Sequence, residues 1–318
     1  MSVLKIHLSY QCTAACAHCR FSCTPDPAPV IDHDLAMQVI TTLQAENDLQ
    51  LVVLLGGEPG LFPALTHQLT RDIRALDVAV RVESNASWAT DDQAAHAFLA
   101  PLFAESASLM FSLDGFHESF VPPERVERAI RTSEQLGGTY NLEMAYLDVA
   151  QRNHSTDRRT DALFAGLTAR LAYEPRAYRG NVFYNGRAAR KLSGNVSQGR
   201  GVPDDLCPAV PWWYHGEQDA LDLLILDADG YLSKGCGIAI GNVKQQSVSE
   251  ILHTFDARRH PVLSTLLRAG PLGLAHEAVE LGYVLKPDYA DRCHLCQEAR
   301  QVLRSKYPEV LQPTQHYR

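Results

Sequence analysis

Strand-like and helix-like segments alternate along the first 190 or so residues of this chain. Short apolar stretches, such as 51–55, alternate with longer segments that place an apolar residue every three or four positions, such as 34–49. Strands are predicted at 3–9, 51–55, 78–83, 109–113, 141–147 and 179–183. Such alternation is typical of a parallel sheet covered by helices. A complete eight-unit barrel needs about 250 residues, so we predict an α/β fold built as a partial (β/α)6 TIM-like barrel.

The composition excludes several classes of protein. The chain has 318 residues, of which 46% are hydrophobic and 21% charged, enough for one large domain and a smaller one. No apolar run approaches the ~20 residues of a membrane span, and no secretory signal opens the sequence, so a cytoplasmic protein is expected. A net charge of −8 argues against a nucleic-acid surface. Eight cysteines without an export signal indicate metal ligands rather than disulfides.

Three of these cysteines follow the first predicted strand with C-x3-C-x2-C spacing. They are Cys12, Cys16 and Cys19. Three thiolates on one loop can hold three irons of a [4Fe–4S] cluster and leave the fourth iron open, whereas a structural cluster normally uses four cysteines. An open position is typical of catalytic metal sites. The residues alone also allow a zinc knuckle, with Cys23 or His18 as its fourth ligand.

A Gly-Gly-Glu-Pro run ends the second predicted strand. It consists of Gly56, Gly57, Glu58 and Pro59. Paired glycines permit close approach of the backbone to a ligand, and the glutamate adds a carboxylate for a cationic group. The run is equally compatible with a simple turn. Because ligands of parallel sheets bind at the carboxyl ends of the strands, its position beside the cysteine loop favours a ligand site.

Together, these motifs resemble those of the radical SAM superfamily. The resemblance implies that Cys12, Cys16 and Cys19 hold a [4Fe–4S] cluster, whose open iron chelates S-adenosylmethionine, and that residues 56–59 hold the methionyl ammonium of that molecule. One-electron reduction then yields a 5′-deoxyadenosyl radical, which abstracts a hydrogen atom from a substrate. A flavodoxin- or ferredoxin-type electron donor is implied as a partner.

Polar side chains stand at three further predicted strands. They are Glu83, Ser84, Asn85, Ser112, Asp114 and Glu143. The segment around Asp114 resembles the family's S-x-D-G element, and the resemblance implies contacts of these residues with the cofactor or the substrate, Asp114 being the catalytic candidate. The alternative is that each caps the helix that follows, with Glu143 a satisfied buried acid.

The character of the sequence changes at about residue 192. Residues 192–205 are rich in Gly, Ser and Asn and are predicted to be a linker or surface loop, which divides the chain into domains 1–191 and 192–318. Four cysteines lie beyond this point, enough for a fully ligated auxiliary [4Fe–4S] cluster or for a four-thiolate zinc site. They are Cys207, Cys236, Cys293 and Cys296.

Other features of the second region support a comparison. An Asp-Gly turn at 229–230 predicts a β-hairpin that leads into Cys236. With the Gly-Arg-Ala run at 186–188 and the Ile-Gly-Asn run at 240–242, the region resembles the small twitch or SPASM domain, which combines a β-hairpin with helices. The resemblance implies an auxiliary [4Fe–4S] cluster.

The roles of two local features and the identity of the substrate stay open. Cys23 is either a small apolar residue of the core or, by analogy with some radical SAM epimerases, a hydrogen donor to a substrate radical. The aromatic run at 212–215 either lines the substrate cavity or packs the small domain on the barrel, and packing is the expectation. Peptide modification by oxidation, crosslinking or epimerisation is the first hypothesis. Dehydrogenation or rearrangement of an aminocyclitol or sugar is the second, and a non-enzymatic zinc or iron–sulfur protein, which has no need of the 56–59 motif, is the third.

Overall fold

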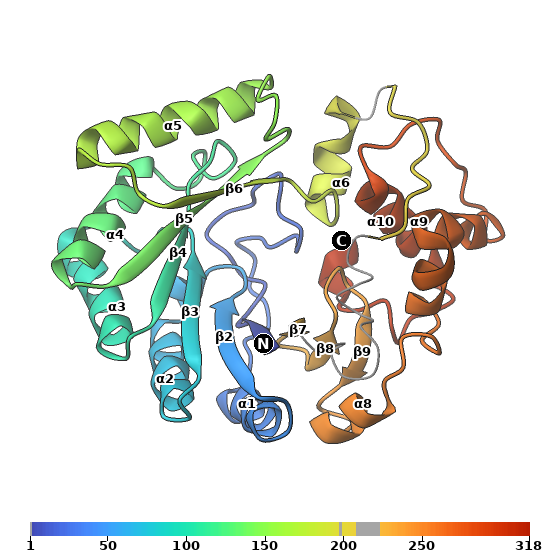
Figure 1. Ribbon diagram of the computed structural model, residues 1–318, viewed down its shortest axis with the longest axis horizontal. Coiled ribbons are helices and arrows are strands. Elements are labelled where there is room, and N and C mark those ends of the chain that lie inside the picture. Colours follow the sequence, from blue (N-terminus) through green and yellow to red (C-terminus); the bar gives the residue numbers. More distant parts are fainter. Residues whose placement is uncertain (1, 197–198, 208–222) are drawn as a thin grey trace.

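The computed structural model describes residues 2–196, 199–207 and 223–318. Nine strands form one sheet in the order β6-β5-β4-β3-β2-β1-β7-β8-β9 (Figure 1). The strands are β1 (Ser2–His7), β2 (Leu49–Leu55), β3 (Ala79–Ser84), β4 (Ser108–Ser112), β5 (Thr139–Tyr146), β6 (Ala177–Asn181), β7 (Leu223–Leu226), β8 (Tyr231–Ser233) and β9 (Ala239–Asn242).

Helices connect the first six strands and follow the last ones. They are α1 (His33–Asn47), α2 (Pro63–Arg74), α3 (Asp92–Ala104), α4 (Pro123–Gln135), α5 (Ser155–Leu171), α6 (Arg187–Lys191), α8 (Val248–Thr254), α9 (Leu263–Val279) and α10 (Arg292–Leu303), with short 3-10 helices η1 (Pro59–Leu61), η2 (Ser193–Asn195) and η4 (Thr314–Tyr317). In Figure 1, α1–α5 lie around the outside of the sheet, and the blue loop that follows β1 lies inside it.

The predicted α/β fold is confirmed. Strands β1–β6 pair in parallel with their neighbours in chain order, as six strand–helix units require. Their core lies between the sheet and its helices, and Ile6 of β1 pairs with the fully buried Leu54 of β2. The predicted sixth strand, 179–183, lies two residues away from the observed β6, whose side chains are mostly exposed. An exposed edge strand lacks the apolar pattern that fixes such boundaries.

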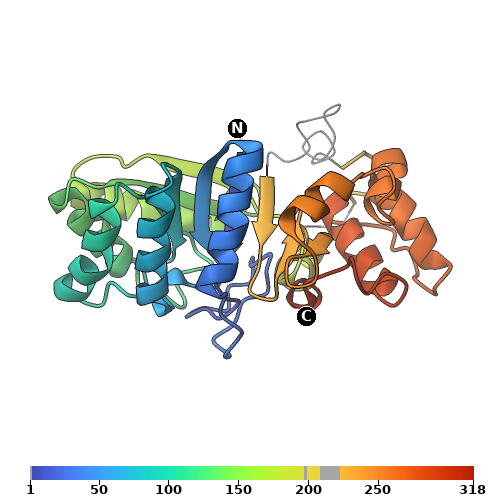
Figure 2. The ribbon, with the colours of Figure 1, turned by 90° about the horizontal axis from the view of Figure 1, so that it is seen from below.

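The C-terminal region adds an antiparallel hairpin to the same sheet. β7 pairs with β1 in parallel, and β8 and β9 then pair antiparallel, with the predicted turn at Gly230. Helices α9 and α10 form a second apolar cluster beyond the hairpin, at the orange and red end of Figure 2, whereas Val248 and Ile251 of α8 belong to the first cluster. β7 follows residue 191 in the chain but pairs with β1, so one sheet includes strands from both predicted domains. The domain division at residue 191 therefore stays a prediction. The predicted linker opens with the 3-10 turn η2, and the aromatic run at 212–215 lies outside the described residues.

Within the described ranges, no helix combines the length and apolar character needed to cross a lipid bilayer.

A buried carboxylate joins the hairpin to the loop after β1. Asp227 is 2% exposed, and its side chain accepts hydrogen bonds from the hydroxyl of Tyr10 at 3.2 Å and from the backbone N–H groups of Asp229 and Tyr231 at 3.0 Å each. Burial raises the pKa of Asp227 to about 7, although the two backbone N–H groups oppose the shift. The folded protein therefore holds this proton more tightly than the unfolded chain does.

Stability is accordingly expected to depend on pH through Asp227. The raised pKa contributes stability that is present below pH ~4 and is lost as the pH rises towards about 7. Asp227→Asn keeps an acceptor for the N–H groups and carries no charge, so we expect it to be more stable than wild type at pH 8 by on the order of 2–4 kcal/mol and similar to it at pH 4. Urea midpoints at the two pH values measure this difference. The exposed Asp229→Asn is the control, and an equal effect of both variants would contradict the assignment to Asp227.

Candidate functional site

The three N-terminal cysteines lie on one loop whose ends are tied together. The backbone N–H of Cys12 donates to the carbonyl of Thr24 at 2.7 Å, and that of Cys19 donates to the carbonyl of Cys16 at 3.1 Å. Cys12 and Cys16 are buried, Cys19 is half-buried, and none forms a disulfide. The three side chains belong to a separate apolar cluster inside the sheet. The loop thus presents three reduced thiols together at the carboxyl end of β1.

The surroundings of Cys12 disfavour a bare thiolate, whereas the hydrogen bond from Cys23 lowers the pKa of Cys19. Burial raises the pKa of Cys12 well above its usual range, and the charges of Glu58, Cys16 and Cys19 act in the same direction. A thiolate that is costly as a bare anion is favoured once a metal takes the place of the proton. The donor set and its burial therefore fit a metal cluster.

The glycines of the Gly-Gly-Glu-Pro run lie against the cysteine loop. A Cβ on Gly57 would lie 1.7 Å from the carbonyl oxygen of Gln11, and one on Gly56, where φ is +144°, would lie 2.5 Å from that of Ser9. The backbone N–H groups of Gly57 and Glu58 donate to the same two carbonyls, at 2.8 and 3.0 Å. The close approach that the paired glycines allow is thus to the cysteine loop, and it holds the end of β2 beside the cysteines.

Glu58 joins the ends of β2 and β3. Its carboxylate, 2% exposed, accepts from the hydroxyl of Ser84 at 2.7 Å and from the backbone N–H groups of Asn85 and Gly60 at 2.9 Å each. Burial raises the pKa of Glu58, against the effect of these donors. The turn expected as an alternative is therefore present too, because Glu58 caps η1 through Gly60. Contact of Glu58 with a methionyl ammonium stays a prediction.

Asn85 is the strand-end residue that reaches the cysteines. Its Nδ2 lies 3.1 Å from Oγ1 of Thr13 and 3.7 Å from Sγ of Cys12. Three of the predicted residues, Glu58, Ser84 and Asn85, thus form one connected group that ends at a thiol.

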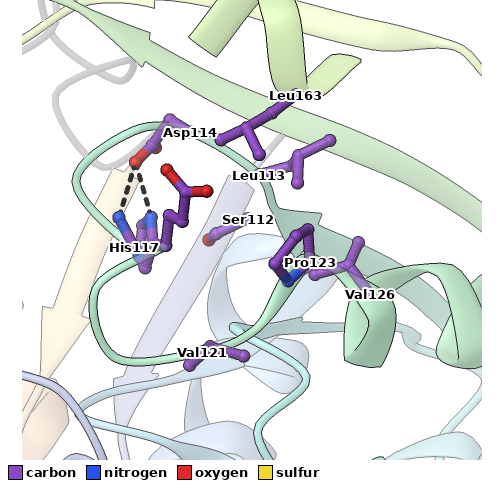
Figure 3. Close-up of a pocket in the computed structure, with 9 residues that line it drawn as sticks. Ser112, Leu113, Asp114, His117, Val121, Pro123, Val126 and Leu163 are labelled. Carbon is purple, nitrogen blue, oxygen red and sulfur yellow. Dashed lines mark hydrogen bonds and ion pairs between the residues drawn. The ribbon is translucent and has the colours of Figure 1, made fainter. Parts of the chain in front are cut away.

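Asp114 is held by donors of its own turn. Its carboxylate accepts from the backbone N–H groups of Phe116 and His117 and from Nδ1 of His117, the last at 2.9 Å (Figure 3). Burial opposes ionisation, but His117 and His18 outweigh it and hold the pKa of Asp114 well below its usual range. The capping of the following helix, which the sequence left as the alternative, is not observed for Asp114, because the N-cap of α4 is Pro122 and has no side-chain bond. A catalytic role for Asp114 stays a prediction.

His117 is a residue that sequence reasoning missed. One ring nitrogen of His117, one of His18 and Sγ of Cys16 all lie within 4.8 Å of one another. Burial disfavours the imidazolium, but Asp114 and Cys16 outweigh it and raise the pKa of His117. His117 thus connects Asp114 to the cysteine loop. The available signal was a histidine three positions after the strand-end aspartate.

Arg187 is the second such residue. It belongs to the Gly-Arg-Ala run, and its Nη1 and Nη2 donate to the carbonyls of Cys16 and Cys23 at 2.9 and 2.6 Å. Its own N–H donates to the carbonyl of Cys19 at 3.1 Å. Arg187, on α6, therefore donates hydrogen bonds to three backbone carbonyls of the cysteine loop. Cys23 itself is buried in the same apolar cluster, and its thiol is hydrogen-bonded to that of Cys19.

The remaining predicted residues lie on β3, β4 and β5. The strand register places Ser112 opposite Glu143, and Lys5 forms an ion pair with Glu83 at 3.3 Å. Glu143 is exposed by surface area, yet burial raises its pKa, so its role stays a prediction. Ser112 lines a small pocket with Asp114 and His117 (Figure 3).

The four C-terminal cysteines also come together. Burial raises the pKa of Cys293, and the charges of Cys207, Cys236 and Cys296 contribute in the same direction. Cys293 and Cys296 stand in the first turns of α10, which Asp291 caps at the N–H of His294. Cys236 lies between β8 and β9 with φ +58°. A hairpin, a helix and the segment at Cys207 thus carry four cysteines that lie close enough for three of them to act on the pKa of Cys293, and this donor set fits a fully ligated metal site.

The chain is similar in fold to several solved structures. The chain is similar to anSMEcpe with bound AdoMet (TM-score 0.55, 12% identity, 97% of this chain and 98% of the other). It is also similar to Streptococcus suis SuiB bound to the precursor peptide SuiA (TM-score 0.51, 12% identity, 99% and 75%). YydG of Bacillus subtilis (strain 168), which is named as a peptide biosynthesis protein, is 21% identical over 162 residues, or 50% of this chain and 51% of YydG. No family model matches the sequence.

Proposed function

We propose that this chain, which has the fold of the radical SAM enzymes, is a radical SAM enzyme that modifies a peptide. One observation carries the proposal. Three cysteines, two of them buried and one half-buried, stand on one loop at the carboxyl end of β1, and the Gly-Gly-Glu-Pro run is hydrogen-bonded to the backbone of that loop. Proteins of similar fold have been solved with AdoMet.

The roles of the chain's residues follow from their positions. When bound, a [4Fe–4S] cluster supplies the electron that cleaves S-adenosylmethionine to methionine and the 5′-deoxyadenosyl radical. Cys12, Cys16 and Cys19 are proposed as its ligands, while Arg187 and Gly57 fix the loop that carries them. Residues 56–59 are proposed to border the methionyl end.

The remaining strand-end residues are assigned by their place in the sheet. Asn85 and Ser84 end the strand beside Glu58, and we propose that they border the cofactor as well. Glu83, Ser112 and Glu143 are proposed to face the cofactor or the substrate, because Ser112 and Glu143 lie opposite each other and the charge of Glu83 acts on Glu143.

A peptide is the proposed substrate. SuiB has been solved with its precursor peptide and anSMEcpe with a Cp18Cys peptide, and YydG is named for peptide biosynthesis. Oxidation, crosslinking and epimerisation all begin with abstraction of one hydrogen atom from the peptide. We place the reaction in a reducing cytoplasm, because cysteines that hold metal clusters must stay reduced. A flavodoxin- or ferredoxin-type protein is the proposed electron donor.

The proposed function is tested by following the transfer of one hydrogen atom from the peptide to 5′-deoxyadenosine. The anaerobically reconstituted protein is expected to convert S-adenosylmethionine and dithionite to 5′-deoxyadenosine and methionine. With deuterated peptides encoded beside the gene, mass spectrometry should find deuterium in the 5′-deoxyadenosine. Cleavage without transfer from any peptide, together with transfer from a deuterated sugar or aminocyclitol, would overturn the peptide assignment. Absence of cleavage would overturn the enzyme class.

The four C-terminal cysteines are proposed to hold an auxiliary [4Fe–4S] cluster that takes the second electron of an oxidation. Cys293→Ala is therefore expected to keep S-adenosylmethionine cleavage within about twofold of wild type and to lose the modified product by more than about a hundredfold. Liquid chromatography of 5′-deoxyadenosine beside mass spectrometry of the peptide separates the two effects. Normal product yield from Cys293→Ala would rule out this role.

A further inference from the structure

A guanidinium lies against the C-terminal cysteines in the interior of the protein. Arg300 on α10 is 1% exposed, and its Nε donates to Sγ of Cys296 at 3.3 Å, one helical turn earlier. Its Nη1 donates to the backbone carbonyl of Cys236. Arg300 thus touches both the helix and the hairpin that supply the cysteines.

Neutral groups hold the guanidinium in this orientation. Nη1 donates to the hydroxyl of Tyr317 at 2.9 Å and Nη2 to Oε1 of Gln297 at 3.1 Å. The hydroxyl of Tyr317 donates in turn to the carbonyl of Gly237 at 2.5 Å. Because each of its three nitrogens has an acceptor, the side chain is positioned by its own bonds rather than by packing alone.

The charge of Arg300 calls for an anionic partner. In the described part of the chain, no carboxylate forms an ion pair with Arg300. An isolated buried cation is strongly unfavourable, and removing one partner from a buried ion pair is strongly destabilising. The negative charge beside this guanidinium therefore belongs to the cysteine thiolates, and Cys296 is the one in contact with it.

We propose that Arg300 raises the reduction potential of the auxiliary cluster through its charge and its hydrogen bond to Cys296. This inference rests on the proposed function, because it requires an iron–sulfur cluster at the four C-terminal cysteines. Addition of one electron makes the cluster and its thiolates more negative by one charge. A guanidinium 3.3 Å from one sulfur stabilises that reduced state more than the oxidised one. Arg300 would thus favour acceptance of an electron at this site.

A redox titration of the reconstituted holoenzyme tests the proposal. Dithionite supplies the electrons, and the EPR signal of the auxiliary cluster reports its reduced fraction. Arg300→Gln keeps a polar side chain without the charge. It is expected to lower the equilibrium constant for reduction at least about tenfold, which is about 59 mV for a one-electron couple. Arg300→Lys keeps the charge and is expected to lower it less.

The chain offers a matched control in Arg304. This arginine lies over the same Tyr317 ring, 5.0 Å from its centroid, and its Nη2 donates to the hydroxyl of Thr314 at 3.0 Å. Arg304→Gln removes an equal charge without removing a hydrogen bond to sulfur. The reduction potential of the auxiliary cluster in Arg304→Gln is expected to match that in wild type. Equal potentials in wild type and an iron-loaded Arg300→Gln, or an equal drop in Arg304→Gln, would overturn the proposal.

Two further measurements keep the outcome clear. If Arg300→Gln fails to retain the cluster, the contact is tested instead in wild-type enzyme produced with isotope-labelled arginine. The reduced auxiliary cluster should then show hyperfine coupling to a guanidinium nitrogen. Absence of coupling would overturn the contact. Metal analysis distinguishes loss of the auxiliary cluster from loss of the role of Arg300. Wild type with about four irons and bound zinc would overturn the auxiliary cluster itself, whereas about eight irons with an unchanged potential in the variant would overturn the role of Arg300 alone.

Discussion

Replacing Cys12, Cys16 and Cys19 together with alanine is expected to abolish S-adenosylmethionine cleavage and to remove about half of the iron. Wild type should hold about eight irons after anaerobic reconstitution and the triple variant about four, because each [4Fe–4S] cluster carries four. The three N-terminal cysteines belong to one apolar cluster, and Cys207 and Cys296 of the C-terminal set belong to another, so loss of the first set should leave the second intact. Iron analysis, low-temperature EPR and chromatography of 5′-deoxyadenosine measure the three quantities.

Cys23→Ala is the control for this variant. Cys23 lies in the same apolar cluster, and its thiol is hydrogen-bonded to that of Cys19. If Cys23 is a core residue or a hydrogen donor, Cys23→Ala should keep about eight irons and normal S-adenosylmethionine cleavage. The peptide product should change only if Cys23 is the hydrogen donor. Loss of metal from Cys23→Ala, or zinc in place of iron in wild type, would instead support the zinc site that the spacing allows. Loss of all iron from the triple variant would contradict an independent C-terminal cluster.

Gly57→Ala is expected to destabilise the protein by ~3 kcal/mol and to prevent cluster loading. The added Cβ would lie 1.7 Å from the carbonyl oxygen of Gln11 and 2.7 Å from the backbone nitrogen of Cys12. Because these neighbours are backbone atoms, the collision can be relieved only by moving the cysteine loop away from β2. Urea midpoints and iron content measure the two effects.

Gly180→Ala is the matched substitution for this prediction. Gly180 lies on β6, and a Cβ there would have nothing within 4 Å, so its stability should stay within about 0.5 kcal/mol of wild type. Similar losses in both variants would mean that glycine flexibility, rather than the contact with the cysteine loop, accounts for the Gly57→Ala result.

The elements of the fold could be predicted because their signals are local. The continuous apolar run at 51–55 predicts a strand buried on both faces, and β2 is such a strand. The prediction was least accurate at β6, which is short, exposed and at the edge of the sheet. Cys12, Cys16 and Cys19 could be named as ligand candidates because their spacing lies within one loop, and the Asp-Gly turn of the hairpin lies within two residues.

What tertiary structure alone decided is which side chains meet across the sheet. Glu58 reaches Ser84, 26 residues away in the chain, and Arg187 reaches Cys16, 171 residues away. Local patterns carry no information about such pairs, since the sheet order brings strand ends together irrespective of their separation in sequence. The sequence by itself therefore determined the six strand–helix units and the two sets of cysteines. Only the folded chain determined that Glu58, His117, Arg187 and Arg300 lie against them, because these contacts exist only once distant strand ends and helices are packed side by side.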